Sequence, residues 1–225
     1  MKKIIILASL WASVAQAEIG LEYYVGAQDH FMWRGFDLSS GEPFLTPGLT
    51  ASIGENIWVD VWGGFNADYQ EIDLTAAYYL EPSEDFGIDL GLVIYTYPGM
   101  DGYDPSYEPF AMIYSYVLPF QPQLLLAYDA TLKTSYLEIS GTTTLMEEGF
   151  ALDLKLGSGL YAWEGFTGIS TVFVEVAKEY EVMGLSVSPT LQFHLIPEGF
   201  RDDVMDPTIT GTEFVFQVNI TGGGE

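Results

Sequence analysis

The sequence contains no cysteine, which excludes disulfide bonds, thiolate metal sites and a cysteine nucleophile. Basic residues are scarce: 7 lysines and arginines stand against 32 acidic residues, and the formal net charge is −25. Because nucleic acid is itself a polyanion, we expect no nucleic-acid partner. Acidic chains with few aromatic residues are often disordered, but here 15% of the residues are aromatic and 48% are hydrophobic, which indicates an ordered protein.

Catalytic motifs are also missing. The chain has only two histidines, His30 and His194, and no GxSxG, HExxH, phosphate-binding loop or dinucleotide fingerprint. We therefore expect a protein that is not an enzyme and needs no metal or other cofactor. A catalytic site assembled from distant strands would leave no such motif, so this inference rests on composition alone.

Long hydrophobic runs are absent after residue 17, so no transmembrane helix is expected there. The first 17 residues differ, because Lys2 and Lys3 precede an apolar stretch that ends in Ala15-Gln16-Ala17. This order of charge, apolar stretch and small-residue cleavage site predicts a signal peptide over residues 1–17. The mature protein would be one domain over residues 18–225.

In the rest of the chain, apolar and polar residues alternate strictly. The alternation is clearest in residues 72–78, 152–156 and 214–220. Side chains of a strand alternate between two faces, so each segment has one apolar and one mostly polar wall. The pattern predicts an all-β fold, a transmembrane antiparallel up-and-down β-barrel of 12 strands. The expected strands are 19–34, 43–53, 57–67, 71–81, 87–97, 108–117, 122–132, 136–145, 150–160, 168–178, 185–195 and 211–221.

The connections between these strands alternate in length. Several odd-numbered ones are long, above all 197–211, whereas 54–56, 82–85, 119–121 and 147–149 are tight. Bacterial outer-membrane barrels have short periplasmic turns, longer external loops and an even strand number, so we expect an outer-membrane location. A soluble β-sandwich also has one apolar face, but the signal peptide, strand lengths and loop asymmetry favour the membrane. Pro47, Pro109 and Pro189 fall inside expected strands, where we expect β-bulges.

The polar wall is strongly acidic. If the apolar wall faces lipid, the carboxylates and a few basic or aromatic side chains face the lumen, and a negative lumen favours cations. We expect the pore to be lined by Glu22, Arg34, Asp60, Trp62, Glu71, Asp73, Asp89, Asp129, Glu138, Asp153, Lys155 and Glu175.

The stretch 29–43, DHFMWRGFDLSSGEP, is followed by VDVWG at 59–63 and EIDL at 71–74. This ordered series resembles the first strands of the TorF-type porins, in which an aromatic-rich strand ends in Arg-Gly before a short serine-containing loop. The resemblance is clearest over residues 22–99 and implies a single-chain outer-membrane barrel with a channel role. One departure is Asp37-Leu38, where the family would have Ser-Gln. The matching positions are Arg34, Gly35, Asp60, Trp62, Gly63, Glu71 and Asp73.

The sequence thus predicts a porin-like channel for ions or small polar solutes, with a preference for cations. Its expected partners are outer-membrane lipid, the barrel assembly machinery and the solutes themselves. Two alternatives stay open: an outer-membrane barrel enzyme that hydrolyses lipid or peptide through His30 or His194, and a non-conducting structural barrel.

Overall fold

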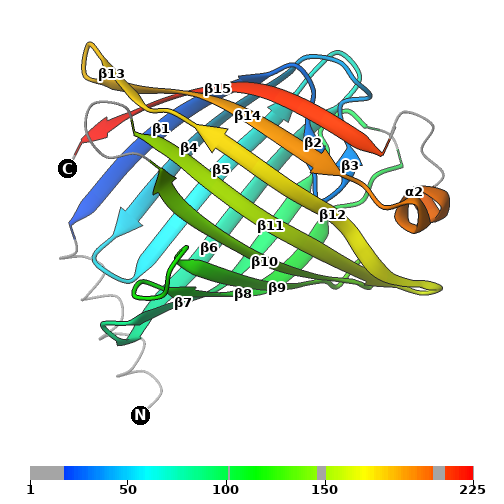
Figure 1. The fold of residues 1–225 in the computed structure, drawn as a ribbon, viewed down its shortest axis with the longest axis horizontal. Helices are drawn as coiled ribbons and strands as arrows, with labels where there is room; N and C mark the ends of the chain where they lie inside the picture. Colours follow the sequence, from blue (N-terminus) through cyan, green and yellow to red (C-terminus); the bar gives the residue numbers. More distant parts are fainter. Residues whose placement is uncertain (1–17, 101, 146–150, 205–210, 225) are drawn as a thin grey trace.

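The computed structural model describes residues 18–100, 102–145, 151–204 and 211–224. The predicted signal peptide lies outside these residues. Twelve strands close into one antiparallel β-barrel (Figure 1). They are β1 (Ile19–Gln28), β4 (Phe44–Ile53), β5 (Ile57–Phe65), β6 (Gln70–Ser83), β7 (Phe86–Thr96), β8 (Ser106–Ser115), β9 (Pro122–Asp129), β10 (Thr134–Leu145), β11 (Leu152–Trp163), β12 (Phe166–Ala177), β14 (Leu185–Leu195) and β15 (Thr212–Gly224).

The barrel closes where its first strand, β1, pairs with its last, β15. Strands adjacent in the sequence pair as hairpins, while β1 also pairs with β15 and β12 pairs with β14. The short strand β13 (Tyr180–Val182) extends the β12–β14 connection and pairs with β14 alone. Closure leaves no free edge in the ring, so every barrel strand has two partners, as a strand within lipid requires. The all-β barrel with 12 strands is therefore confirmed.

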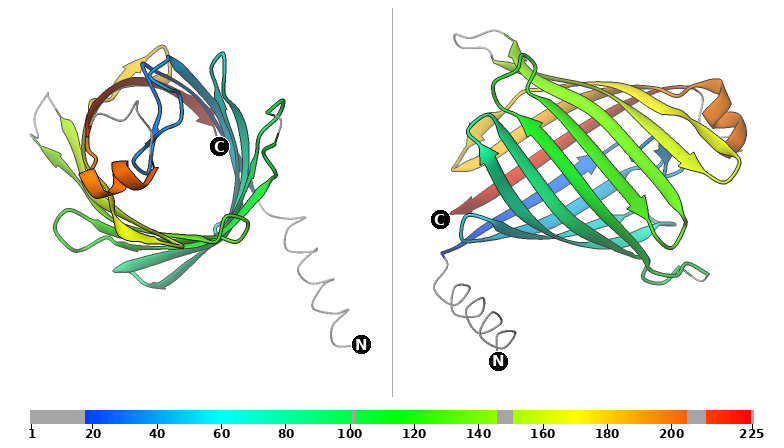
Figure 2. Two further views of the ribbon diagram at one scale, coloured as in Figure 1. Left: turned by 90° about the vertical axis from the view of Figure 1, so that its right-hand side faces the viewer. Right: turned by 90° about the horizontal axis from the view of Figure 1, so that it is seen from below.

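Both ends of the described chain lie at one end of the barrel, which we call the terminal end (Figure 2). The opposite end, the loop end, carries helix α2 (Glu198–Val204) and the connection 97–105. Not every connection at the loop end is long, because β11 and β12 are joined by Glu164-Gly165 alone. None of the helices in the described part of the chain is long and apolar enough to span a bilayer.

The outer wall is apolar, as the alternation predicts. Outward side chains along the strands are exposed, for example Leu74, Ile139 and Phe214. A water-soluble protein would bury such a belt, whereas a bilayer solvates it. The fold and its apolar exterior identify an outer-membrane β-barrel.

The prediction for the prolines is wrong in one respect. Pro47, Pro109 and Pro189 lie inside β4, β8 and β14, but the pairing shows no register shift at any of them. Instead Pro47 has no paired residue in β5 and Pro109 has none in β9. Pro189 lies just past the end of the β12 ladder, where its carbonyl oxygen accepts a hydrogen bond from the Lys178 N–H at 3.2 Å. A missing N–H can be tolerated where the ladder is already interrupted.

The first predicted strand was too long. It was expected to run to Arg34, but β1 ends at Gln28, and the chain then turns into the barrel as a small hairpin of β2 (Met32–Trp33) and β3 (Phe36–Asp37). Figure 2 shows this hairpin inside the ring when the barrel is viewed from the loop end. Its side chains belong to the buried hydrophobic cluster, which includes Met32, Tyr161 and Phe200. The core of this barrel therefore lies within its loop half.

Prediction for the exterior: Ile139→Arg should destabilise the folded protein in lipid by about 2–4 kcal/mol, the cost of an arginine near the bilayer midplane. Ile139 faces outward near the middle of β10 and is 58% exposed. The measurement is the urea dependence of folding into phospholipid vesicles. Leu132→Arg, in the exposed turn between β9 and β10, is the control and should have little effect; equal costs at both positions would contradict the membrane-facing assignment.

Candidate functional site

The inner wall carries the predicted acidic residues. Strand pairing places Asp60 opposite Thr50 and Thr75, and Asp73 opposite Trp62 and Tyr95, so these side chains share the inward face. The same register argument puts inward all the predicted strand residues: Glu22, Asp60, Trp62, Glu71, Asp73, Asp89, Asp129, Glu138, Asp153, Lys155 and Glu175. That they line a conducting pore stays a prediction.

Arg34 is the exception, because it lies on the hairpin rather than on the wall. Its backbone has φ 54° and is followed by Gly35 at φ 98°, which makes a tight turn between β2 and β3. The turn aims the guanidinium across the lumen at β8. There Nη1 and Nη2 donate to the two carboxylate oxygens of Glu108 at 2.6 and 2.7 Å. The pair spans 74 residues of sequence.

The surroundings of this ion pair are aromatic. The guanidinium carbon lies 4.5 Å from the ring centroid of Trp33 and 4.3 Å from that of Tyr136, so the charge is held between two π faces. The Tyr95 hydroxyl donates to Glu108 at 2.8 Å. Glu108 is 3% exposed. Such a two-point contact with a planar carboxylate requires arginine rather than lysine.

The tip of the hairpin touches the opposite wall. A Cβ on Gly35 would lie 2.6 Å from the backbone oxygen of Ser170 and 3.2 Å from the Phe200 ring. Ser170 is the extra residue of a bulge, because Gly159 pairs with Thr171 while Leu160 pairs with Ile169. Only glycine fits this approach and this φ. The Arg-Gly pair of the sequence therefore has a structural reason.

Helix α2 covers the hairpin at the loop end. Phe200 is 1% exposed, and its ring lies 5.0 Å from that of Phe36 and 5.9 Å from that of Trp163. Edge-to-face contacts of this kind add to the burial of the rings. The hairpin is thus fixed by an ion pair on one side and by an aromatic cluster on the other.

Glu108 was missed by the sequence reasoning. It begins an inward series with Phe110, Met112 and Tyr114, but the outward residues of β8 are also apolar, so the two faces of this strand do not differ clearly. Pro109 next to it further obscured the pattern. The available signal was the alternation of faces along the paired strands. Glu108 is opposite Val93, and Val93 lies on the same inward face of β7 as Asp89 and Tyr95.

Most other carboxylates of the wall have neutral hydrogen-bond donors. Asp60 accepts from the Thr50 hydroxyl at 2.6 Å and the Tyr24 hydroxyl at 3.2 Å. Asp89 accepts from the Trp58 indole and the Tyr114 hydroxyl. Because these donors carry no charge, they satisfy the oxygens without cancelling the negative potential.

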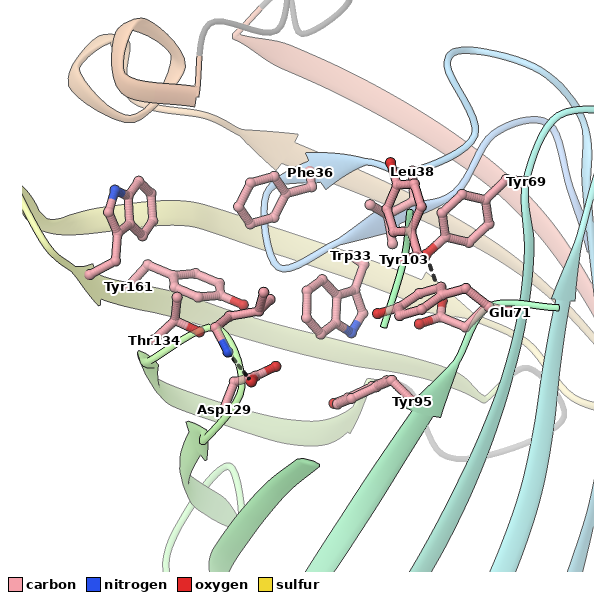
Figure 3. Close-up of a pocket in the computed structure, with 13 residues that line it drawn as sticks. Trp33, Phe36, Leu38, Tyr69, Glu71, Tyr95, Tyr103, Asp129, Thr134 and Tyr161 are labelled. Carbon is pink, nitrogen blue, oxygen red and sulfur yellow. Dashed lines mark hydrogen bonds between the residues drawn. The ribbon is translucent and has the colours of Figure 1, made fainter. Parts of the chain in front are cut away.

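The hairpin separates two cavities. The outer cavity, toward the loop end, has a volume of about 440 Å³ and is lined largely by aromatic rings together with Glu71 and Asp129 (Figure 3). The inner cavity, about 330 Å³, lies against Arg34, Glu138 and His194. Trp33 contributes to both linings, so the hairpin forms the partition between them.

The two histidines have different polar neighbours. His194 Nδ1 lies 3.3 Å from the Thr171 hydroxyl and Nε2 lies 3.2 Å from the Gln192 side-chain oxygen. His30 Nδ1 lies 3.1 Å from Asp29. Within the described ranges, no group of three or more metal-ligating side chains is arranged to hold a metal ion.

Comparison with known proteins agrees with this architecture. Residues 12–145 match a family model described as "Bacterial protein of unknown function (Gcw_chp)". The chain belongs to this family. No curated protein matches the sequence. Among solved structures the fold is similar to the "KdgM porin in complex with disordered oligogalacturonate", with 9% identity, TM-score 0.59 and coverage of 92% of this chain and 99% of that one.

A second porin gives the same result. The NanC porin is 9% identical, with a TM-score of 0.55 and coverage of 90% of this chain and 98% of that one. At such identity the two similarities show the fold alone. The resemblance noted in the sequence is thus confirmed as a resemblance to outer-membrane porins; the TorF-type assignment itself stays a prediction.

Prediction for the ion pair: Arg34→Ala should lower the free energy of unfolding by about 3–5 kcal/mol, because it leaves the Glu108 carboxylate buried without its cation. The double variant Arg34→Ala with Glu108→Ala should cost less than the sum of the two single changes. Urea unfolding in detergent, followed by tryptophan fluorescence, measures all three variants. Lys155→Ala is the control, since Lys155 has no ion pair within 4.0 Å in the described part of the chain. Strict additivity of the two single changes would show that the ion pair does not couple the hairpin to the wall.

Proposed function

We propose that this protein is a porin-like outer-membrane channel, narrowed by the β2–β3 hairpin, that passes small cations in preference to anions. The observation that carries the proposal is the imbalance of charge on the inner wall of a closed barrel. Inward carboxylates lie on ten of the 12 strands, whereas in the described strands and hairpin the inward basic groups are Arg34, bound to Glu108, and Lys155. Low-dielectric walls concentrate the resulting negative potential within the lumen.

The solute class differs from that suggested by one structural neighbour. KdgM was solved with oligogalacturonate, whose sugar units carry carboxylates. A chain with net charge −25 and an acidic lumen would repel such a polyanion. We therefore carry over from the porins the channel role and not the ligand.

A second candidate function is a barrel that does not conduct. The hydrophobic cluster around Met32, Tyr136 and Phe200 favours it, because this cluster occupies part of the loop half of the lumen beside the outer cavity. The experiments below separate the two candidates.

Prediction for selectivity: in a planar bilayer with unequal KCl on the two sides, the reversal potential should have the cation-selective sign. The preference should shrink as salt rises, because the screening length falls from about 10 Å at 0.1 M to about 3 Å at 1 M. The triple variant Asp60→Asn, Glu71→Gln and Asp73→Asn should weaken it, because these three neighbouring carboxylates lie on β5 and β6.

The matched control removes three charges outside the wall: Glu55→Gln, Glu84→Gln and Asp85→Asn, all in exposed turns at the terminal end. This variant should keep the selectivity of the original protein. Anion selectivity would refute the proposal, and the absence of any single-channel current would favour the non-conducting barrel.

Prediction for the hairpin: replacing residues 31–38 by a glycine-serine linker of equal length should raise the single-channel conductance, because it removes the partition between the two cavities. Replacing 179–183, in the exposed β12–β14 connection, by the same kind of linker is the control and should leave conductance unchanged. An unchanged conductance without the hairpin would show that the constriction lies elsewhere. Heat-modifiable migration on gels verifies that both variants fold.

A further inference from the structure

The outer cavity is lined by aromatic rings that come from four different parts of the chain. Trp33 belongs to the hairpin, Tyr95 to β7, Tyr97 and Tyr103 to the connection 97–105, and Trp163 to the end of β11. Figure 3 shows labelled rings of this set, Trp33, Tyr95 and Tyr103, facing a common space beside Glu71. Ring faces carry negative electrostatic potential, so a cavity walled by them attracts a cation that is only weakly hydrated.

Two carboxylates, those of Glu71 and Asp129, also line this cavity. Each of these residues is only 5% exposed. Glu71 accepts a hydrogen bond from the Tyr69 hydroxyl at 2.9 Å. Asp129 accepts from the Ser106 hydroxyl and from the backbone N–H groups of Thr131 and Leu132. All of these donors are neutral.

A buried carboxylate normally has a cationic partner. In the described part of the chain, no basic side chain lies within 4.0 Å of Glu71 or Asp129. The nearby Arg34 is bound at two points by Glu108, so its charge is already matched. Lys133 lies in the exposed turn between two lining residues, at the rim. The cavity therefore combines an aromatic wall with unmatched negative charge.

The fields of the two carboxylates meet inside this cavity. Burial raises the pKa of the Tyr97 hydroxyl, and the negative charges of Glu71, Asp73 and Asp129 raise it further. Tyr97 follows the end of β7 and lies within the lining of the outer cavity. A cation placed beside this ring would interact favourably with both carboxylates.

We propose that the outer cavity is a binding site for a small organic cation of the methylated-ammonium class. Its charge would lie between Glu71 and Asp129, and its methyl groups would pack against the rings of Trp33, Tyr97 and Tyr103. This proposal deepens the channel function and rests on it for the route by which the cation arrives. A metal ion suits the cavity less, because apart from the two carboxylates its walls are mainly rings, whereas Ca²⁺ takes about six to eight oxygen ligands. A neutral sugar would leave the carboxylates unmatched.

The test is isothermal titration calorimetry of the whole barrel, refolded in a non-ionic detergent, with choline as the probe. The comparison ligand is the neutral carbon isostere of choline, in which a quaternary carbon replaces the nitrogen. It has the same shape and differs only in charge. Choline should bind at least about tenfold more tightly, since a single matched charge in a partly buried site is worth that factor or more. Equal affinities, or tighter binding of glucose, would overturn the proposal.

Variants locate the site. Asp129→Asn and Glu71→Gln keep hydrogen-bond acceptors but remove charge, and each should weaken choline binding by roughly tenfold. Asp153→Asn makes the same chemical change on the inner wall away from the cavity and should bind like the original protein. Tyr103→Ala removes an exposed ring that contacts Tyr97 and should weaken binding a few-fold. Unchanged binding in Asp129→Asn and Glu71→Gln, with Asp153→Asn as reference, would exclude this cavity.

Bilayer recording separates failure of the site from failure of the channel. Choline added on the loop side should reduce the potassium current of the original protein and affect Glu71→Gln less. Calorimetric binding without any measurable potassium current would reject the channel and keep the site. Potassium current with no binding and no reduction by choline would keep the channel and reject the site.

Discussion

The buried pair of Arg34 and Glu108 is the interaction on which the interior of this barrel depends. A closed ring of 12 strands leaves space in the lumen, and the pair fixes what occupies it. With the guanidinium bound at two points and held between Trp33 and Tyr136, the hairpin has one position against β8. The inner and outer cavities exist because that position divides the lumen.

The same interaction shapes the electrostatics. The basic group of the hairpin, Arg34, is already matched by Glu108, so it does little to offset the remaining carboxylates. Several of those carboxylates, such as Asp60, Asp89 and Asp129, accept hydrogen bonds from hydroxyl, indole and backbone donors, which stabilise the oxygens without adding positive charge. Under the proposed function, a lumen built in this way would keep a negative potential despite extensive hydrogen bonding, and mobile cations would be its counter-charges.

The division of the lumen also assigns different chemistry to its two compartments. The outer one has mainly aromatic walls with the buried carboxylates Glu71 and Asp129, whereas the inner one has polar side chains such as Glu138, Gln192 and His194. A solute entering from the loop end would meet the aromatic compartment first. Under the proposed channel function, it would reach the hairpin only after this compartment.

The sequence by itself determined the barrel. Strict alternation fixes which side chains face inward, because the strand period is two, and this placed residues such as Asp60, Glu71 and Asp129 on the inner face without any knowledge of strand pairing. Only the tertiary structure decided what fills the lumen. The partner of Arg34 lies 74 residues away, on a strand whose two faces are both largely apolar. Strand β1 ends at Gln28 because burying the following aromatic side chains inside the barrel is more favourable than extending the strand. Such contacts form only when the ring closes, so no local pattern encodes them.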